Sequence, residues 1–144
     1  MSILRDDRLL ALHDLVEACR ASARFAELAA DLLKDDARAR DLEALAAARN
    51  DAADRLCAPI IESEDIPAAP PEERGLLDTV LASAKATFAE DGGRALLADC
   101  REKEQEVRRL AEAAAAAPLR ENEKAIAAEL EKDARSRLAR LLQA

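Results

Sequence analysis

The chain has 144 residues, half of them hydrophobic, yet only two are aromatic and tryptophan and tyrosine are absent. This composition predicts a single domain over residues 1–144 with an aliphatic core, because a chain of this length buries about two thirds of its unfolded surface. The formal net charge of −8 argues against a nucleic-acid-binding protein, since such proteins need a basic surface to neutralise phosphates.

The sequence also lacks the features of a membrane or secreted protein. No apolar run approaches the roughly 18 residues that a membrane span needs. Acidic residues interrupt the apolar positions of the N-terminal segment, so no signal-peptide core is recognisable. We therefore expect no membrane span and a cytoplasmic location.

Residue types that favour helix dominate the chain. Alanine and leucine lie at the favourable end of the helix-propensity scale, and glutamate, arginine and lysine are good helix formers too. Only three glycines and five prolines interrupt the sequence, which favours long helices over a turn-rich sheet. The fold class that we predict is all-α.

The first half of the chain predicts a helical hairpin. Apolar residues recur at intervals of three and four over residues 6–33, as on one face of an amphipathic helix. Asp35 and Asp36 can cap a second helix, which we expect to end at Leu56 or Cys57. Because the connection is so short, the two helices should be antiparallel.

The middle of the chain predicts a long crossover. Residues 58–71 contain four of the five prolines and three acidic residues, which argues for an extended segment rather than a regular helix. A shorter helix is expected over residues 72–90, and Gly92 and Gly93 should end it because glycine accepts the left-handed conformation.

The last third predicts a second hairpin, with helices over residues 94–117 and 119–142 on either side of Pro118. Together the four long helices predict a four-helix bundle of two antiparallel hairpins, joined by a long crossover that carries one short extra helix.

Two charged residues interrupt otherwise apolar helix faces. Arg49 does so in the second helix and Glu104 in the fourth. Because a buried charge left alone is costly, we expect the two side chains to pair across the bundle. The alternative is that both helices are rotated slightly and both side chains reach solvent.

The single histidine and the three cysteines offer weaker signals. His13 precedes Glu17 by one turn, which predicts a surface pair, although a base, a metal ligand or a pH sensor is the alternative. Cys19, Cys57 and Cys100 are odd in number and widely spaced, which suits neither a disulfide framework nor a zinc site. We expect three buried, inert thiols, while a thiol of Cys100 activated by neighbouring basic residues is the alternative.

Three segments, CRASARFAELAADLLKDD, DLEALAAARNDAADRL and LLADCREKEQEVRRLAEAA, resemble an uncharacterised bacterial branch of the ferritin-like four-helix bundles. Ferritin-like proteins with two metal ions place a Glu on each of two helices and a Glu-x-x-His pair on each of the other two. The present sequence departs from that motif, since its only histidine, His13, has Leu10 three residues before it.

The resemblance also indicates where the ligand positions of such a site would fall. The acidic positions of the first and fourth helices fall on Asp31 and Glu104, whereas Ala48 and Arg135 stand near the other two positions. The motif is therefore degenerate. A site for iron or manganese would have to rely on carboxylates alone, for which the weak candidates are Glu17, Glu27, Asp31 and Glu104.

No phosphate-binding loop, catalytic triad or Cys-x-x-Cys motif is present, so we predict no catalytic residues and no cofactor. The function that we predict is that of a non-catalytic bundle, acting as a homodimer or as an adaptor for another helical protein. The resemblance adds a role in bacterial stress physiology. Two alternatives remain: a degenerate ferritin-like metal-binding protein or oxidoreductase, and an amphipathic protein of lipid or granule surfaces.

Overall fold

The computed structural model describes residues 6–34, 37–63, 82, 85–86 and 88–143. Their regular structure is helical throughout, without strands, which confirms the all-α prediction for this part of the chain. The long helices are α1 (Asp7–Leu33), α2 (Ala37–Glu62), α4 (Arg94–Ala113) and α5 (Glu121–Gln143), and a short 3-10 helix at Ala114–Ala116 follows α4.

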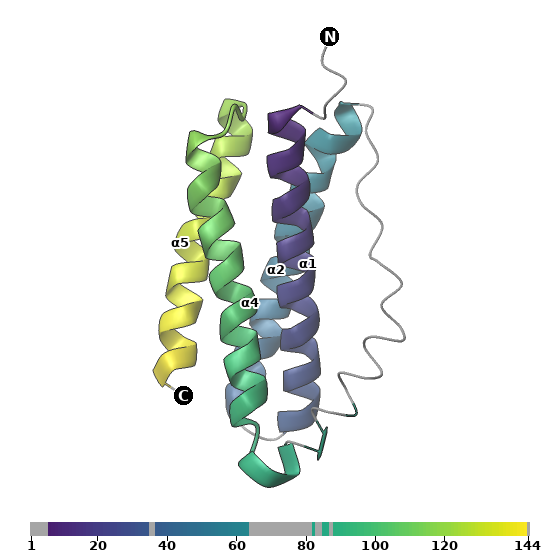
Figure 1. The fold of residues 1–144 in the computed structure, drawn as a ribbon, viewed down its shortest axis with the longest axis vertical. Helices are drawn as coiled ribbons and strands as arrows, with labels where there is room; N and C mark the ends of the chain where they lie inside the picture. Colours follow the sequence, from purple (N-terminus) through teal and green to yellow (C-terminus); the bar gives the residue numbers. More distant parts are fainter. Residues whose placement is uncertain (1–5, 35–36, 64–81, 83–84, 87, 144) are drawn as a thin grey trace.

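The four long helices lie side by side as a bundle (Figure 1). α1 packs most extensively against α2, then against α4, while α4 packs against α5 and α2 makes the sparsest contact with α5. α1 is antiparallel to α2 and α4 is antiparallel to α5, whereas α2 and α4 run in the same direction (Figure 1). The end of α2 and the start of α4 therefore lie at opposite ends of the bundle.

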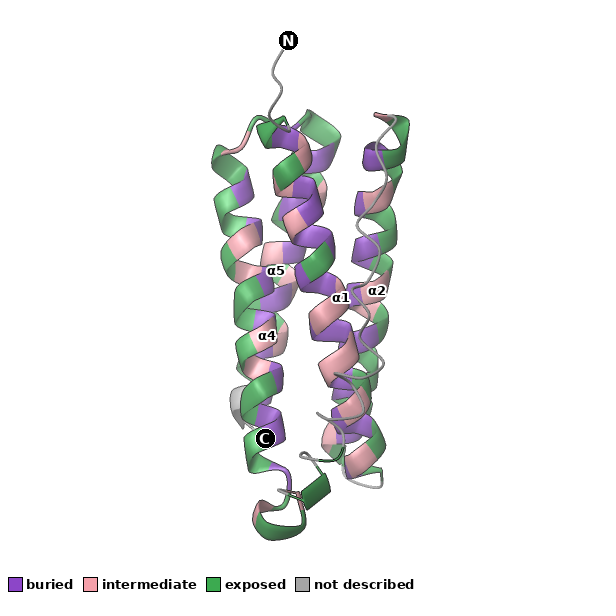
Figure 2. Ribbon diagram, turned by 45° about the vertical axis from the view of Figure 1, so that its right-hand side comes forward, coloured by how far each residue is buried: buried purple, intermediate pink, exposed green. Residues whose placement is uncertain are grey.

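Two apolar clusters form the core, one towards each end of the bundle. Leu15, Leu56 and Val107 belong to the first cluster. Leu45 and Cys100 belong to the second, which is rich in alanine. Buried residues recur along the helices on the sides that face their neighbours, as apolar residues at intervals of three and four predict (Figure 2).

The turn before α4 depends on two glycines. Gly92 and Gly93 have φ values of +67° and +93°, in the left-handed region that favours glycine. The N–H of Gly92 donates to the carbonyl of Phe88. A Cβ at Gly93 would lie only 2.9 Å from the Phe88 ring, so this position requires glycine for space as well as for conformation. The prediction that a helix ends at these glycines is confirmed.

The end of α2 corrects the prediction that residues 58–71 avoid regular helix. Residues 58–62 continue α2, with Pro59 inside the helix. Proline removes one backbone hydrogen bond, but Pro59 and Ile60 are both buried, and this burial compensates for the lost bond. Ser63 then closes the helix, because its hydroxyl and its N–H both donate to the carbonyl of Pro59.

Part of the predicted crossover lies outside the described residues. This holds for residues 64–71 and for most of the helix predicted over residues 72–90. Within the latter range, residues 82, 85–86 and 88–90 are helical. The two C-terminal helices begin and end within a few residues of the predicted bounds.

Candidate functional site

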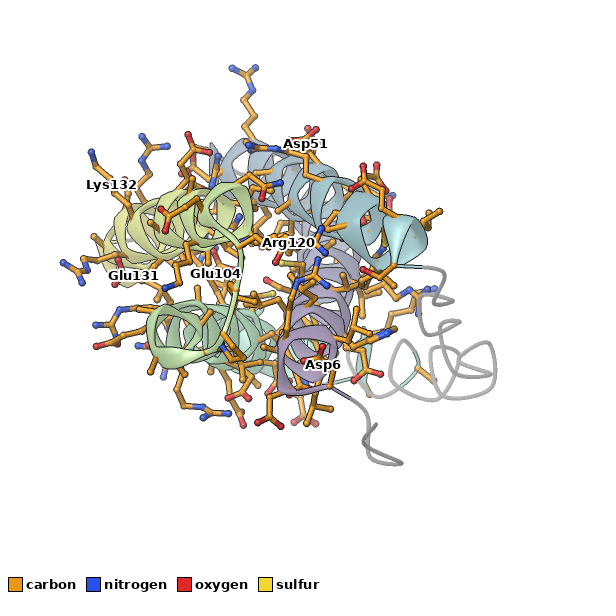
Figure 3. All side chains as sticks on the ribbon, turned by 90° about the horizontal axis from the view of Figure 1, so that it is seen from above. Asp6, Asp51, Glu104, Arg120, Glu131 and Lys132 are labelled. Carbon is orange, nitrogen blue, oxygen red and sulfur yellow. The ribbon has the colours of Figure 1, made fainter. Side chains whose placement is uncertain are left out.

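A layer of polar side chains crosses the middle of the bundle between the two apolar clusters. Each long helix contributes one member to this central polar layer: Ser22 from α1, Arg49 from α2, Glu104 from α4 and Asp133 from α5. On α2, for example, Arg49 stands between Leu45 of one cluster and Leu56 of the other. In the view down the bundle, Glu104 lies between the surrounding helices (Figure 3).

Arg49 and Glu104, the two residues that interrupt apolar faces in the sequence, lie against each other. The Nε atom of Arg49 is 2.9 Å from Oε1 of Glu104, and its Nη2 atom is 2.8 Å from Oε2. Arg49 is 1% exposed and Glu104 is fully buried. The guanidinium and the carboxylate thus meet edge to edge, the geometry in which arginine and carboxylate bind most strongly.

Ser22 and Asp133 complete the hydrogen bonding of the central pair. The hydroxyl of Ser22 donates to Oε1 of Glu104 over 3.0 Å. Nη2 of Arg49 also donates to Oδ2 of Asp133 over 2.6 Å, and the same oxygen accepts from Nε of Arg137 over 2.8 Å. Every oxygen of the buried carboxylate is therefore engaged, which is the condition for keeping a charge inside a protein.

Arg49 and Asp133 keep their charges in this layer. Burial by itself would lower the pKa of Arg49, but hydrogen bonds to Glu104 and Asp133 outweigh burial and raise it. Burial would raise the pKa of Asp133, yet hydrogen bonds from Arg137 and Arg49 lower it below the ordinary value. A guanidinium that stays protonated cannot exchange protons near neutral pH, so the layer suits holding four helices in register rather than acid–base catalysis.

A groove between α2 and α5 opens onto this layer. Its volume is about 330 Å³, and it lies between α2 and α5, which contact each other less extensively than the other neighbouring pairs of long helices do. Ala48, Ala52 and Leu130 contribute apolar surface, and Arg49 and Asp133 contribute polar surface. An exposed ion pair between Arg55 and Glu129, 3.3 Å apart, also borders it.

The four carboxylates considered for iron or manganese do not come together. Glu17, Glu27 and Asp31 are exposed on α1, and Glu27 accepts a hydrogen bond from Asn50 on the neighbouring helix. Glu104 is buried on α4, where Arg49 and Ser22 occupy its oxygens. Within the described residues, no three His, Cys, Asp or Glu side chains could hold a metal ion together. The donor set therefore does not fit either metal.

A second buried ion pair ties α1 to α5 at the end of the bundle where both begin. Arg8 binds both carboxylate oxygens of Glu123, which is fully buried. Oε1 of Glu123 also accepts the N–H of Arg120, three residues earlier, as in a capping box. Nη1 of Arg8 donates to the hydroxyl of Ser63 at the end of α2. One arginine thus connects three helices.

The sequence contains two signals for this pair. Arg8 stands four residues before Leu12, so Arg8 continues the buried face of α1 towards the start of the helix. Glu123 occupies the third position of α5, the usual place for a glutamate that caps a helix. The spacing alone does not show that the two face each other, because they are 115 residues apart.

The lowered pKa values of Glu123 and Asp133, whose carboxylates bind arginines across the bundle, predict a loss of stability in acid. Burial would raise the pKa of Glu123, but hydrogen bonds from Arg8 and from the N–H of Arg120 lower it, and the pKa of Asp133 is lowered too. A group with a lowered folded pKa stabilises the protein fully above its unfolded pKa, about 4, and loses this contribution as the pH falls through its folded pKa. We expect the midpoint of urea unfolding to change little from pH 7 to 5 and to fall below pH 5.

A variant isolates the contribution of Glu123 to this pH dependence. In Glu123→Gln the side chain takes up no proton between pH 5 and pH 3, so the decrease in stability over this range should be smaller than in the unchanged protein. An equally steep decrease in the variant would show that other carboxylates account for the acid sensitivity.

His13 does not lie on the surface, where the predicted pair with Glu17 placed it. It is 3% exposed, while Glu17 is exposed. The reason is the width of the buried face of α1, which packs against both α2 and α4 and buries Leu12 and His13 together with Leu15 and Val16. Spacing identifies the centre of such a face more reliably than its edges.

The cysteines are reduced, and two of them are buried as predicted, whereas Cys57 is only half-buried. Burial raises the pKa of Cys19 and of Cys100 to about 12. The thiol of Cys100 lies 3.4 Å from the carbonyl of Phe25. The alternative of an activated thiol at Cys100 is therefore wrong.

We expect one of the three thiols to react quickly with an aromatic disulfide reagent in the folded protein. Of the three, only Cys57 is partly exposed. Cys19 and Cys100 are buried, and burial raises their pKa to about 12, whereas a thiol reacts as its thiolate. Absorbance should show one fast equivalent, which Cys57→Ala removes, and two more after denaturant is added. A fast equivalent that survives in Cys57→Ala would contradict this assignment.

No protein-family model, curated protein or solved structure matches the chain. No helix among the described residues has both the length and the apolarity to cross a bilayer.

Proposed function

We propose that the chain is a ferritin-like four-helix bundle in which an ion-pair layer replaces the metal site, and that it acts without catalysis by associating with a second copy of itself. The order and direction of the helices support the first part. Because α2 and α4 run in the same direction, a single long connection joins two antiparallel hairpins, as in ferritin-like bundles.

The observation that carries the non-catalytic part is the position of Arg49. Ferritin-like metal sites use carboxylates and histidines that project inwards from all four helices. Here all four helices also contribute inward groups, but the one from α2 is a cation that binds the carboxylates of Glu104 and Asp133. A guanidinium supplies the positive charge that a metal ion would otherwise supply, and it has no redox chemistry of its own.

Exposed apolar side chains support association. Leu10 on α1 is 46% exposed and Ile61 on α2 is 60% exposed. Both lie at the end of the bundle where α1 begins and α2 ends, which the hydrogen bond from Arg8 to Ser63 holds together. Large apolar side chains at one end of a small bundle favour contact with a matching surface, and a second copy supplies such a surface by symmetry.

Native mass spectrometry of gently purified protein tests both parts at once, because it reports subunit number and bound metal together. We expect a metal-free dimer. The double variant Leu10→Glu, Ile61→Glu should be monomeric, while Ala98→Glu, an exposed substitution on α4, should stay dimeric. A monomer at all concentrations would overturn self-association and favour a different helical partner. Iron or manganese bound in a one-to-one ratio would overturn the non-catalytic reading.

A further inference from the structure

The groove between α2 and α5 combines aliphatic and charged side chains in a volume that suits a small molecule. Its volume of about 330 Å³ lies at the lower end of the range of small-molecule sites. Aliphatic surface comes from both helices, from Ala48 and Ala52 on one side and from Ile126 and Leu130 on the other. The groove can therefore take the apolar body of a ligand.

One nitrogen of Arg49 remains available to such a ligand. The side chain of Arg49 makes its hydrogen bonds to described residues through Nε and Nη2 alone, with Glu104 and Asp133 as acceptors. Nη1 makes none of these bonds, and it is not enclosed by protein atoms. Because Arg49 is only 1% exposed and lines the groove, the space that Nη1 reaches is the groove. Its two N–H groups thus offer donors to an acceptor oxygen of the ligand.

The charges that line the groove favour a cation over an anion. Three carboxylates, those of Asp51, Glu129 and Asp133, stand against the two guanidinium groups of Arg49 and Arg55. Glu129 pairs with Arg55, and Asp133 pairs with Arg49. Asp51 is exposed at the periphery of the bundle and forms no ion pair with a described residue (Figure 3). An excess of one negative charge remains.

The ion-pair partners outside the groove leave this balance unchanged. Arg137 binds Asp133, and Glu104 binds Arg49. Each adds one charge, of opposite sign, so that four carboxylates stand against three guanidinium groups. The donor at Nη1 therefore suits an uncharged oxygen, such as a carbonyl, better than a carboxylate or a phosphate.

We propose that this groove binds a small aliphatic ligand that carries a carbonyl oxygen and an ammonium group, the combination found in amino-acid amides and at the N-terminus of a peptide. The carbonyl oxygen accepts from Nη1 of Arg49, the aliphatic part contacts Ala48 and Leu130, and the excess of carboxylates attracts the ammonium group. The proposal goes beyond the association described above and does not depend on it, because Leu10 and Ile61 do not line the groove.

The test is a titration of ¹⁵N-labelled protein with L-leucinamide at constant ionic strength and about pH 6.5, where its amine is protonated. NMR is suitable because the chain has no tryptophan or tyrosine for fluorescence. We expect saturable shifts of the side-chain N–H signals of Arg49 and of the amide signals of Ala48, Ala52 and Leu130. Shifts that increase linearly with leucinamide would overturn the proposal.

Two analogues test the two polar groups of the ligand. The compound 3-methylbutylamine lacks the carbonyl oxygen and should bind about tenfold more weakly, because a hydrogen bond to a charged donor is lost. N-acetyl-leucinamide lacks the ammonium group and should also bind more weakly. Equal affinity of 3-methylbutylamine and leucinamide would show that Nη1 of Arg49 is not the donor. A short peptide amide that begins with leucine separates the sources: binding as tight as that of leucinamide would assign the groove to a peptide N-terminus, and binding of leucinamide alone to a free amide.

Matched variants locate the site without changing Arg49. Ala48→Leu fills the groove and should abolish saturable binding, whereas Ala47→Leu adds the same volume at an exposed position of α2 that does not line the groove, and should leave the affinity unchanged. Asp51→Asn removes an exposed charge and should weaken binding by about two- to fivefold, while Glu43→Gln on the same helix should not. An equal loss in Ala48→Leu and Ala47→Leu, or unchanged affinity in both Ala48→Leu and Asp51→Asn, would place the binding elsewhere.

Discussion

Replacing Arg49 with methionine should lower the free energy of unfolding by about 3–5 kcal/mol, because it leaves a buried carboxylate without its counterion. Glu104 is fully buried, and without Arg49 its only described donor is the hydroxyl of Ser22. For a domain of this size the expected loss lowers the melting temperature by roughly 10 °C. Urea unfolding followed by circular dichroism measures it directly, since the fold is helical.

Two further variants separate the ion pair from simple packing. Arg55 lies on the same helix as Arg49, and Arg55→Met removes only its exposed pair with Glu129 of α5. This variant should cost less than about 1 kcal/mol. The double variant Arg49→Met, Glu104→Met removes both buried charges, and should recover most of the stability lost in the single variant. If the double variant were as unstable as the sum of the two single variants, the pair would not be the cause of the loss.

The helical spacing identified two members of the central polar layer and missed the other two for a physical reason. Arg49 and Glu104 stand out because they are charged residues at the centre of apolar faces. Asp133 lies at the edge of the buried face of α5, half exposed, and Ser22 is one small polar residue among several alanines. In the sequence alone, Asp133 therefore looks like an ordinary surface residue and Ser22 like an ordinary core residue. Their roles depend on side chains of neighbouring helices.

The same limit bears on the weak candidates for a metal site and on the end of α2. Glu17, Glu27 and Asp31 are exposed on α1, and among the described residues they form no metal-binding cluster with the buried Glu104. The proline at position 59 suggested an early end of α2, although the burial of Ile60 favours a longer helix. Local patterns predict which segments are helical, whereas the contacts that decide their ends and their inward groups come from other helices.

At the end of the bundle where α1 and α5 begin, Glu123→Ala should lower the free energy of unfolding by about 3–5 kcal/mol. The reason is that Arg8 would keep its charge in a buried position without the carboxylate that it binds there. Arg8 is 8% exposed and would retain only the hydroxyl of Ser63 among its described side-chain partners. The N–H of Arg120 would also lose its acceptor. Thermal unfolding should show a melting temperature lower by roughly 10 °C.

Two further variants, Glu123→Gln and Glu121→Ala, show whether this loss of stability comes from the buried ion pair, from the cap or from the start of α5 in general. Glutamine can still accept from Arg8 and from the N–H of Arg120, so its variant should lose the charge interaction but keep the cap, and its stability should lie between those of the alanine variant and the unchanged protein. Glu121 is exposed in the first turn of the same helix, and its replacement should cost less than about 1 kcal/mol through the helix dipole alone. If Glu121→Ala and Glu123→Ala were equally unstable, the effect would belong to the start of α5 in general. If only Glu123→Ala loses several kcal/mol of stability, the buried contact with α1 is what holds the two hairpins together at this end.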